Sequence, residues 1–359
     1  MFPKIRDIQD ILPHIKDKKE FIVANKDGYT VIDYVFTKND TFENSIHSEC
    51  RGIKFTTSGS LLSRPFHKFH NYGENEKYTN VSFRDSHYIL DKLDGSMIHS
   101  AYLEGELVFM TRMGITDHAL RAFNLFGRQE NYRSLCDVIE SYKSTPMFEF
   151  TAPDNRIVIG YDKPELTLLD IRHKETGKYW DREGIIKIAQ DYQISSVPGY
   201  KGSELGEPKK LIEETRKILG KEGIVISFSS GFKVKIKADD YVLKHRTLAF
   251  FNSQDKILDL IFEGKVDDVL PLLEEGDISR LLAFEIRVRD CIQEQTTYAL
   301  EVLNLIKSEN LTRKEAAIKV MKECKDISPV IFKCLDGQDC YSIMEAHLNK
   351  NRHLLNVIW

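Results

Sequence analysis

The strongest constraint on the fold of this chain is a change of residue pattern near His245. Before it, short β-branched and aromatic runs are separated by clusters of Gly, Asn, Asp and Pro, as in strands joined by turns. After it, apolar residues recur every three or four positions, as on one face of an amphipathic helix. The sequence therefore predicts an α+β domain over residues 1–244, with mainly antiparallel sheets, and an all-α domain over residues 245–359.

The individual elements follow from the same two periodicities. The predicted strands are 30–36, 88–93, 96–103, 106–112, 146–152, 156–161, 166–172, 223–228 and 232–237. The predicted helices are 118–142, 182–192, 208–220, 278–306 and 315–327, the last preceded by a capping box of Thr312 and Glu315. Asp94-Gly95 lies between two predicted strands, which is a strong signal for a two-residue hairpin turn.

The charge balance and the cysteines exclude several classes of protein. With 51 Lys and Arg against 55 Asp and Glu, a phosphate-binding surface would have to be local. The charged N-terminus does not fit a signal peptide, and no apolar run of about 18 residues predicts a membrane span. We therefore expect a soluble cytoplasmic protein, in the host cytoplasm if a phage or virus encodes it. Six cysteines fit a reducing compartment, and the spacing of Cys324, Cys334, Cys340 and His347 matches no compact zinc motif.

The segment Lys92-Leu93-Asp94-Gly95 is the first of several polar motifs with two interpretations. It fits a hairpin turn beside a solvated lysine, and it fits a nucleophilic lysine presented by a turn. Arg51 and Lys68 likewise suit surface salt bridges or contacts to phosphate and ribose oxygens.

Two further motifs place charges on strands. Glu149 lies between two phenylalanines, so an alternating strand would direct its carboxylate to the face opposite the rings. Glu222 precedes a glycine and a strand, and the next strand carries Lys233, Lys235 and Lys237 on one face. That stripe fits either a protected edge strand or an anion site, since like charges on one face repel unless an anion lies between them.

The order of these motifs suits the handling of a nucleoside triphosphate. The series offers one candidate nucleophile, several cations for the phosphates, and two carboxylates for ribose or a metal. Phosphoryl-type transfer depends mainly on positioning and charge stabilisation, which cations converging on one lysine would supply. The same cations are expected to favour the uncharged, nucleophilic form of the Lys92 amine.

The ordered set resembles the covalent nucleotidyltransferases, which include polynucleotide ligases and messenger-RNA capping enzymes. Within them it is most similar to the ATP-dependent RNA ligases of the T-even bacteriophage type, the RNA ligase 1 family. The matching motifs are ECRGI, SRP followed by KF and an Asn, DGS after the lysine, FEF-APDNRIV, EG-V and KIK-D-YV. They extend from about residue 49 to residue 245.

The resemblance implies a role for each matching residue. Lys92 corresponds to the lysine that becomes linked to AMP. The implied nucleotide-binding residues are Arg51, Lys68, Asp94, Gly95, Arg112, Glu149, Lys235 and Lys237, and the implied metal-binding residues are Glu222 and Glu149. ATP and Mg²⁺ are the implied cofactors, with Mn²⁺ as a substitute. The sequence departs from many relatives at Leu169, where those relatives have an aromatic residue. We therefore expect either an aliphatic side chain or a residue elsewhere in the chain to pack on the face of the adenine base.

The implied activity is ATP-dependent joining of RNA 5′-phosphate and 3′-hydroxyl ends through lysyl-AMP and an adenylylated 5′ end. The implied setting is RNA repair, with nicked tRNA as a candidate substrate and a polynucleotide kinase-phosphatase as a candidate partner. A DNA ligase or mRNA guanylyltransferase is the nearest alternative, although those families typically append an OB barrel where this chain predicts helices that would dock RNA. A non-catalytic RNA-binding protein on the same scaffold is an alternative of another class.

Overall fold

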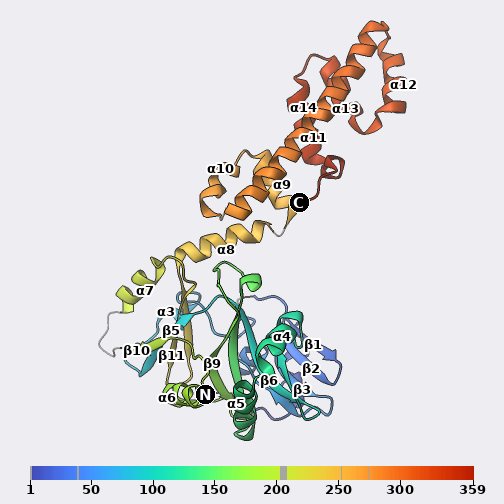
Figure 1. Ribbon diagram of the computed structural model, residues 1–359. Coiled ribbons are helices and arrows are strands. Elements are labelled where there is room, and N and C mark those ends of the chain that lie inside the picture. The colour runs from blue at the N-terminus through green and yellow to red at the C-terminus, as the bar shows by residue number, and fades with distance from the viewer. Residues whose placement is uncertain (1, 39, 203–207, 252, 274) are drawn as a thin grey trace. The chain divides into compact units, whose positions relative to one another are not determined.

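The chain folds into two compact units (Figure 1). The computed structural model describes residues 2–38, 40–202, 208–251, 253–273 and 275–359. The units are Met1–Val242 and Leu243–Trp359, so the division falls two residues before the predicted one.

The strands of the first unit all belong to antiparallel sheets. Within the described residues there are three sheets of four strands each. In sheet order they are β1 (Phe21–Lys26), β2 (Tyr29–Tyr34), β3 (Ile53–Thr56) and β4 (Leu61–Ser63); β10 (Gly199–Lys201), β5 (His87–Lys92), β11 (Gly223–Phe228) and β12 (Lys233–Lys237); and β7 (Glu106–Met110), β6 (Ser96–Leu103), β8 (Ser144–Thr151) and β9 (Glu165–His173). Antiparallel sheets next to helices agree with the predicted α+β class.

The predicted hairpin at Asp94-Gly95 is wrong. β5 pairs with β10 and β11, whereas β6 pairs with β7 and β8 in another sheet. Residues 93–95 therefore carry the chain from one sheet to the next. A Cβ on Gly95 would lie 2.4 Å from the Phe150 carbonyl oxygen, so the glycine is needed because the connection passes close to β8.

The strand predicted at 156–161 is also wrong. The segment is irregular, and the backbone N–H groups of Val158 and Ile159 donate to the Asp94 carboxylate at 2.7 and 2.8 Å. The Asp94 carboxylate thus accepts hydrogen bonds that the carbonyl groups of a neighbouring strand would accept if the segment were a strand.

The helices of the first unit pack around its sheets. They are α1 (Leu12–Ile15), α2 (Ser45–Glu49), α3 (Glu76–Thr79), α4 (Asp117–Ala122), α5 (Glu130–Ser141), α6 (Arg182–Asp191), α7 (Pro208–Arg216) and α8 (Asp239–Phe251), which continues into the second unit. Apolar residues of α4, α5 and α6 share one buried cluster with β6, β8 and β9. The helix predicted at 118–142 is interrupted, because a π-helical turn at Phe123–Gly127 separates α4 from α5.

The second unit is helical where the structure describes it. Its helices are α9 (Gln254–Phe262), α10 (Val266–Val269), α11 (Glu275–Ser308), α12 (Arg313–Glu323), α13 (Ser328–Leu335) and α14 (Cys340–Lys350). One face of the long helix α11 is buried, including Leu281, Phe284, Val288 and Ile292, and forms a core with the other helices. The Thr312–Glu315 capping box is formed as predicted. Among the described helices, none has the length and apolar character that a membrane crossing requires.

Candidate active site

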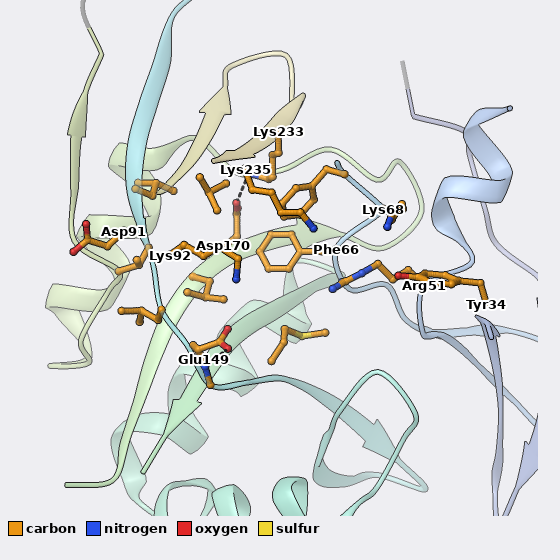
Figure 2. Close-up of a pocket in the computed structure, with 18 residues that line it drawn as sticks. Tyr34, Arg51, Phe66, Lys68, Asp91, Lys92, Glu149, Asp170, Lys233 and Lys235 are labelled. Carbon is orange, nitrogen blue, oxygen red and sulfur yellow. Dashed lines mark hydrogen bonds and ion pairs between the residues drawn. The ribbon is translucent and has the colours of Figure 1, made fainter. Parts of the chain in front are cut away.

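A cavity of about 310 Å³ in the first unit brings most of the predicted site residues together (Figure 2). Its walls come from β5, β11 and β12 in one sheet, from β6, β8 and β9 in another, and from the segments around Arg51 and Lys68. The lining residues are Tyr34, Arg51, Phe66, Lys68, Phe69, Leu90, Asp91, Lys92, Leu93, Gly95, Met97, Glu149, Leu169, Asp170, Val197, Val225, Lys233 and Lys235.

Lys92 ends strand β5 and is held in the cavity by an ion pair. Its backbone lies opposite Gly223 in the β5–β11 register, which places the neighbouring Glu222 beside it. Lys92 Nζ lies 2.7 Å from Glu222 Oε2, and Lys237 Nζ lies 2.9 Å from Glu222 Oε1. The ion-pair partner of the Lys92 amine is thus a carboxylate, one of the two that the motifs offered.

Three predicted cations also line the cavity, and their positions favour an anion. The Nη1 atom of Arg51 is buried and has no hydrogen-bond partner among the described residues. Burial, reinforced by the nearby charges of Lys68 and Lys92, lowers the pKa of Lys235 to about 7. The Lys68 ammonium lies over the rings of Tyr34 and Phe42, at 5.4 and 5.2 Å from their centroids. A bound phosphate would supply the acceptor that Arg51 lacks and the opposite charge that Lys235 lacks.

Glu149 occupies the strand face that the alternation predicted. The rings of Phe148 and Phe150 are fully buried in the opposite core, while the Glu149 carboxylate lines the cavity. Its Oε1 accepts a hydrogen bond from the Gly95 N–H at 3.1 Å. Burial raises the pKa of Glu149 to about 8 against the opposing effect of Lys92. Near pH 7 this side chain is therefore largely a neutral acid, able to donate a hydrogen bond to a ligand oxygen.

Asp94 follows Lys92 by two residues and is absent from the residues that line the cavity within the described chain. Its Oδ1 accepts the Tyr241 hydroxyl at 2.7 Å, and its Oδ2 accepts the N–H groups of Val158 and Ile159. The Tyr161 hydroxyl also lies 3.0 Å from the Asp94 backbone nitrogen. These contacts fix the connection that presents Lys92, which is the role that the turn interpretation gave to Asp94.

Arg112 also lies outside the described cavity lining. Its Nε donates to Asp33 Oδ2 at 2.7 Å, and its guanidinium lies 4.6 Å from the centroid of the Tyr34 ring. Tyr34 does line the cavity, so Arg112 supports one of its walls.

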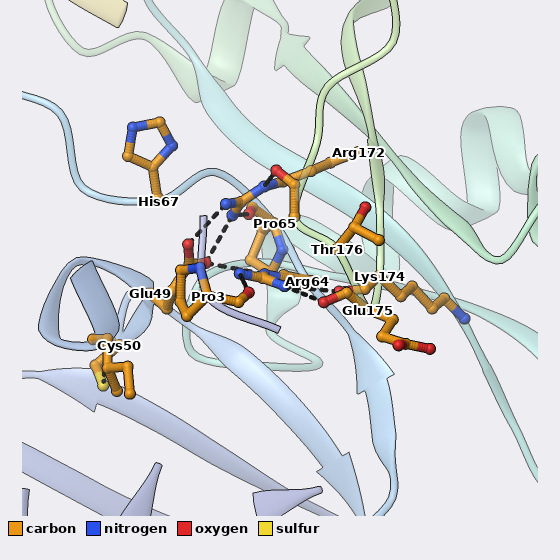
Figure 3. A network of polar contacts seen from close by, with 12 residues as sticks. Pro3, Glu49, Cys50, Arg64, Pro65, His67, Arg172, Lys174, Glu175 and Thr176 are labelled. Carbon is orange, nitrogen blue, oxygen red and sulfur yellow. Dashed lines mark hydrogen bonds and ion pairs between the residues drawn. The ribbon is translucent and has the colours of Figure 1, made fainter. Parts of the chain in front are cut away.

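A buried network holds the segments that carry Arg51 and Lys68 (Figure 3). Glu49 accepts hydrogen bonds from Arg64 at 3.0 Å and from both terminal nitrogens of Arg172 at 2.9 and 2.8 Å. Burial opposes ionisation of Glu49, but the two guanidinium groups outweigh it and lower the carboxyl pKa to about 2. Glu49 precedes Arg51 by two residues and Arg64 precedes Lys68 by four. The network therefore anchors the segments that lead to Arg51 and to Lys68 to Arg172 in β9.

Some cavity residues were not predicted as site residues. Phe66 and Phe69 lie in the basic and aromatic segment around Lys68, and that composition was a usable signal. Asp170 gave no signal, because an acidic residue in an apolar strand has many structural explanations. Leu169 lines the cavity, and the described lining also holds Tyr34, Phe66 and Phe69 as aromatic candidates for stacking.

Comparisons with known proteins agree with this geometry. The sequence matches the RNA ligase family over residues 49–241, which is 193 of 359 residues. RNA ligase 1 of bacteriophage TS2126 is 25% identical over 334 residues, covering 88% of this chain and 81% of that protein. A protein of Autographa californica nuclear polyhedrosis virus, whose name joins a polynucleotide kinase to an RNA ligase, is 27% identical over 277 residues, covering 68% of this chain and 38% of that protein.

A solved structure supports the fold. An archaeal ATP-dependent RNA ligase aligns with a TM-score of 0.51 and 16% identity over 97% of this chain and 96% of that one. The predicted fold class and the predicted class of enzyme are confirmed. The family match covers more than half of the sequence and includes Arg51, Lys92 and Glu149, which line the cavity. The chain therefore belongs to the RNA ligase family.

Proposed function

We propose that this RNA ligase binds ATP in the cavity and transfers AMP to Lys92. The neutral Nζ attacks the α-phosphorus, a P–N bond forms, and the bond from that phosphorus to the bridging oxygen of the β-phosphate breaks. Pyrophosphate leaves, and the amine loses a proton. The Glu222 carboxylate, 2.7 Å from Nζ, is the nearest group that can accept it.

The observation that carries this proposal is the convergence of one lysine and an unsatisfied arginine on a single cavity. Arg51 Nη1 is buried without a partner among the described residues, and Arg51 lines the same cavity as Lys92 and Lys235. A buried guanidinium nitrogen without an acceptor costs free energy, and a triphosphate would supply the acceptor.

The donor set fits Mg²⁺ held mainly by phosphate and water oxygens. Among the described residues no cluster of three acidic, histidine or cysteine ligands exists, so a dedicated all-protein cage is not available. Glu149 and Glu222 offer one or two carboxylates, which is what Mg²⁺ commonly takes beside substrate phosphates. When bound, the ion would neutralise phosphate charge and favour the ionised form of Glu149.

The later steps would use an RNA 5′-phosphate, which takes the AMP from Lys92, and an RNA 3′-hydroxyl, which then displaces AMP. A kinase that prepares such ends is a suitable partner, and the baculovirus relative whose name joins the two activities supports this. The helical unit Leu243–Trp359 is proposed to dock RNA, with nicked tRNA as the first substrate to test.

Mass spectrometry of the chain with ATP or GTP and Mg²⁺ tests the first step. We expect the mass of one AMP on the peptide that contains Lys92, and no adduct in Lys92→Ala. Lys221→Ala is the matched control, because Lys221 is half-exposed and pairs with Asp91 outside the proposed chemistry. An adduct in Lys92→Ala would contradict the assignment, and the absence of any adduct in the folded wild type would favour the non-catalytic RNA-binding alternative. Comparing RNA with DNA ends then separates this proposal from a DNA ligase, and a GMP adduct would favour a guanylyltransferase.

A further inference from the structure

We infer that the buried Asp170–Lys233 pair recognises the six-amino group of adenine. This rests on the proposed function, because it assumes that the nucleotide occupies the cavity beside Lys92. The pair lies among the apolar residues of that cavity, and no step of the proposed chemistry uses it.

The apolar part of the cavity identifies where a base would lie. Leu90 precedes Lys92 by two residues on the same face of β5, roughly 7 Å along the strand. Val225 faces Leu90 across the β5–β11 register, and Leu169 and Val197 add aliphatic surface. With the phosphates beside Lys92, the base therefore falls between these aliphatic side chains.

Asp170 lies at the edge of this slot, where it lines two cavities. A second cavity of about 450 Å³ shares Leu90 and Asp170 with the first and extends past Tyr88, two residues further along β5. Asp170 thus occupies the boundary between the two cavities, where the outer edge of a base would arrive.

The pair is buried, and each member has hydrogen-bonding capacity left. Lys233 Nζ lies 2.6 Å from Asp170 Oδ2 (dashed in Figure 2) and 2.5 Å from Ser227 Oγ, while Asp170 Oδ1 accepts the N–H of Ile171. Asp170 and Lys233 are only 4% and 1% exposed. An ammonium has three N–H donors and a carboxylate accepts about four hydrogen bonds, so both groups can make further hydrogen bonds. The Lys233 ammonium also lies 4.3 Å from the centroid of the Tyr179 ring, a weaker contact that a ligand acceptor could replace.

The available groups complement adenine in this orientation. The six-amino group of adenine donates to the Asp170 carboxylate, and an adjacent ring nitrogen accepts from Lys233. Purine riboside carries only hydrogen at the same position, so it would leave the carboxylate without this donor. A site built around a hydrogen bond discriminates against an analogue that lacks the group, because its own buried polar atoms are then left unpaired.

The experiment measures the rate of adduct formation with ATP, GTP and purine riboside triphosphate, which lacks the six-amino group. In the wild type we expect ATP to exceed purine riboside triphosphate roughly 10- to 100-fold in kcat/KM, the range of one charge-assisted hydrogen bond. In Asp170→Asn this ratio should fall towards one, because the acceptor for the amino group has been weakened. Asp91→Asn is the matched control, since Asp91 also lines the cavity but pairs with the half-exposed Lys221, and it should keep the wild-type ratio.

The double variant Asp170→Asn/Lys233→Met removes both charges and keeps the test valid if the single variant misfolds. Equal rates for ATP and purine riboside triphosphate in the wild type would overturn the inference, as would an unchanged ratio in a folded Asp170 variant. A wild-type preference for GTP would overturn it as well. If no nucleotide gives an adduct, the proposed function itself fails, which is a different outcome.

Discussion

Lys235 shows at the residue scale what a site for phosphates costs the folded protein. Burial among Lys68 and Lys92 lowers its pKa to about 7, from a value of 10.5 without these effects. Between these two values the unfolded chain binds more protons than the folded chain, so this residue makes stability rise with pH from about 7 towards 10. Near pH 7, folding must therefore remove about half a proton from Lys235, which lowers stability.

Lys235→Met is accordingly expected to stabilise the fold at pH 7, by about 1–3 kcal/mol after allowing for partial solvent screening. The gain should shrink as the pH approaches 10.5, because the free-energy cost of removing the proton from Lys235 on folding falls with every step in pH above 7. Urea unfolding at pH 7 and pH 9.5 measures the difference. Lys163→Met, at an exposed position, should change little. A Lys235→Met variant less stable than the wild type at pH 7 would contradict the argument.

At the scale of elements, the connection between β5 and β6 determines where the nucleophile lies. Asp94 is 2% exposed and links this connection to the segment around Val158 and to Tyr241 at the start of α8. Its carboxylate accepts each of these hydrogen bonds, and an amide nitrogen could not.

Asp94→Asn replaces one carboxylate oxygen with an NH₂ group, which would face the N–H groups of Val158 and Ile159 or the hydroxyl of Tyr241. The variant should therefore be less stable than the wild type by about 2–4 kcal/mol and should form the adduct more slowly. Asp91→Asn, three residues earlier and paired with the half-exposed Lys221, should stay within about 0.5 kcal/mol of the wild type. Denaturation and adduct assays on both variants make the comparison. Equal stability of the two variants would show that the buried contacts of Asp94 carry no special weight.

Gly95→Ala addresses the same connection through sterics. The new Cβ would lie 2.4 Å from the Phe150 carbonyl oxygen, so either β8 or the connection must move. We expect adduct formation to fall by more than tenfold, and the Gly160→Ala variant, whose new Cβ meets open space, to remain active. Full activity in Gly95→Ala would mean that the position of Lys92 tolerates this shift.

The sequence predicted the positions of individual strands and helices better than it predicted which strands pair with each other. Alternation in β8 correctly separated Glu149 from Phe148 and Phe150, since strand periodicity is a local property. The hairpin at Asp94-Gly95 failed because the choice between pairing locally and crossing to another sheet depends on distant strands such as β11. The segment 156–161 failed for a related reason, because its hydrogen-bond acceptor lies about 60 residues earlier in the chain. The motifs pointed to Lys92 and several cations, whereas Asp170 became recognisable only because β9 and β5 line the same cavity.

At the scale of the whole molecule, the residues of the candidate site all come from the first unit. The last of the described cavity residues is Lys235, and Tyr241 lies in the same unit near its end. The first unit should therefore suffice for the reaction with ATP, and the helical unit should matter for RNA.

A chain shortened to residues 1–251, which keeps α8, should form the lysyl-AMP adduct at a rate within about tenfold of the full chain. Its joining of RNA ends should be strongly reduced. Mass spectrometry measures the first activity and gel analysis of labelled RNA the second, with Lys92→Ala in the same shortened chain as the control. A folded fragment that joins RNA as well as the full chain would remove the proposed role of the helical unit.

The ion pair between Lys92 and Glu222 has a consequence for the enzyme between catalytic cycles. One carboxylate holds two lysines, because Glu222 Oε2 lies 2.7 Å from Lys92 Nζ and Glu222 Oε1 lies 2.9 Å from Lys237 Nζ. A long, flexible side chain is thereby restricted in its rotamers while the cavity is empty. An arriving nucleotide would therefore meet an amine whose direction is already set, and less rotational entropy would be lost at that moment.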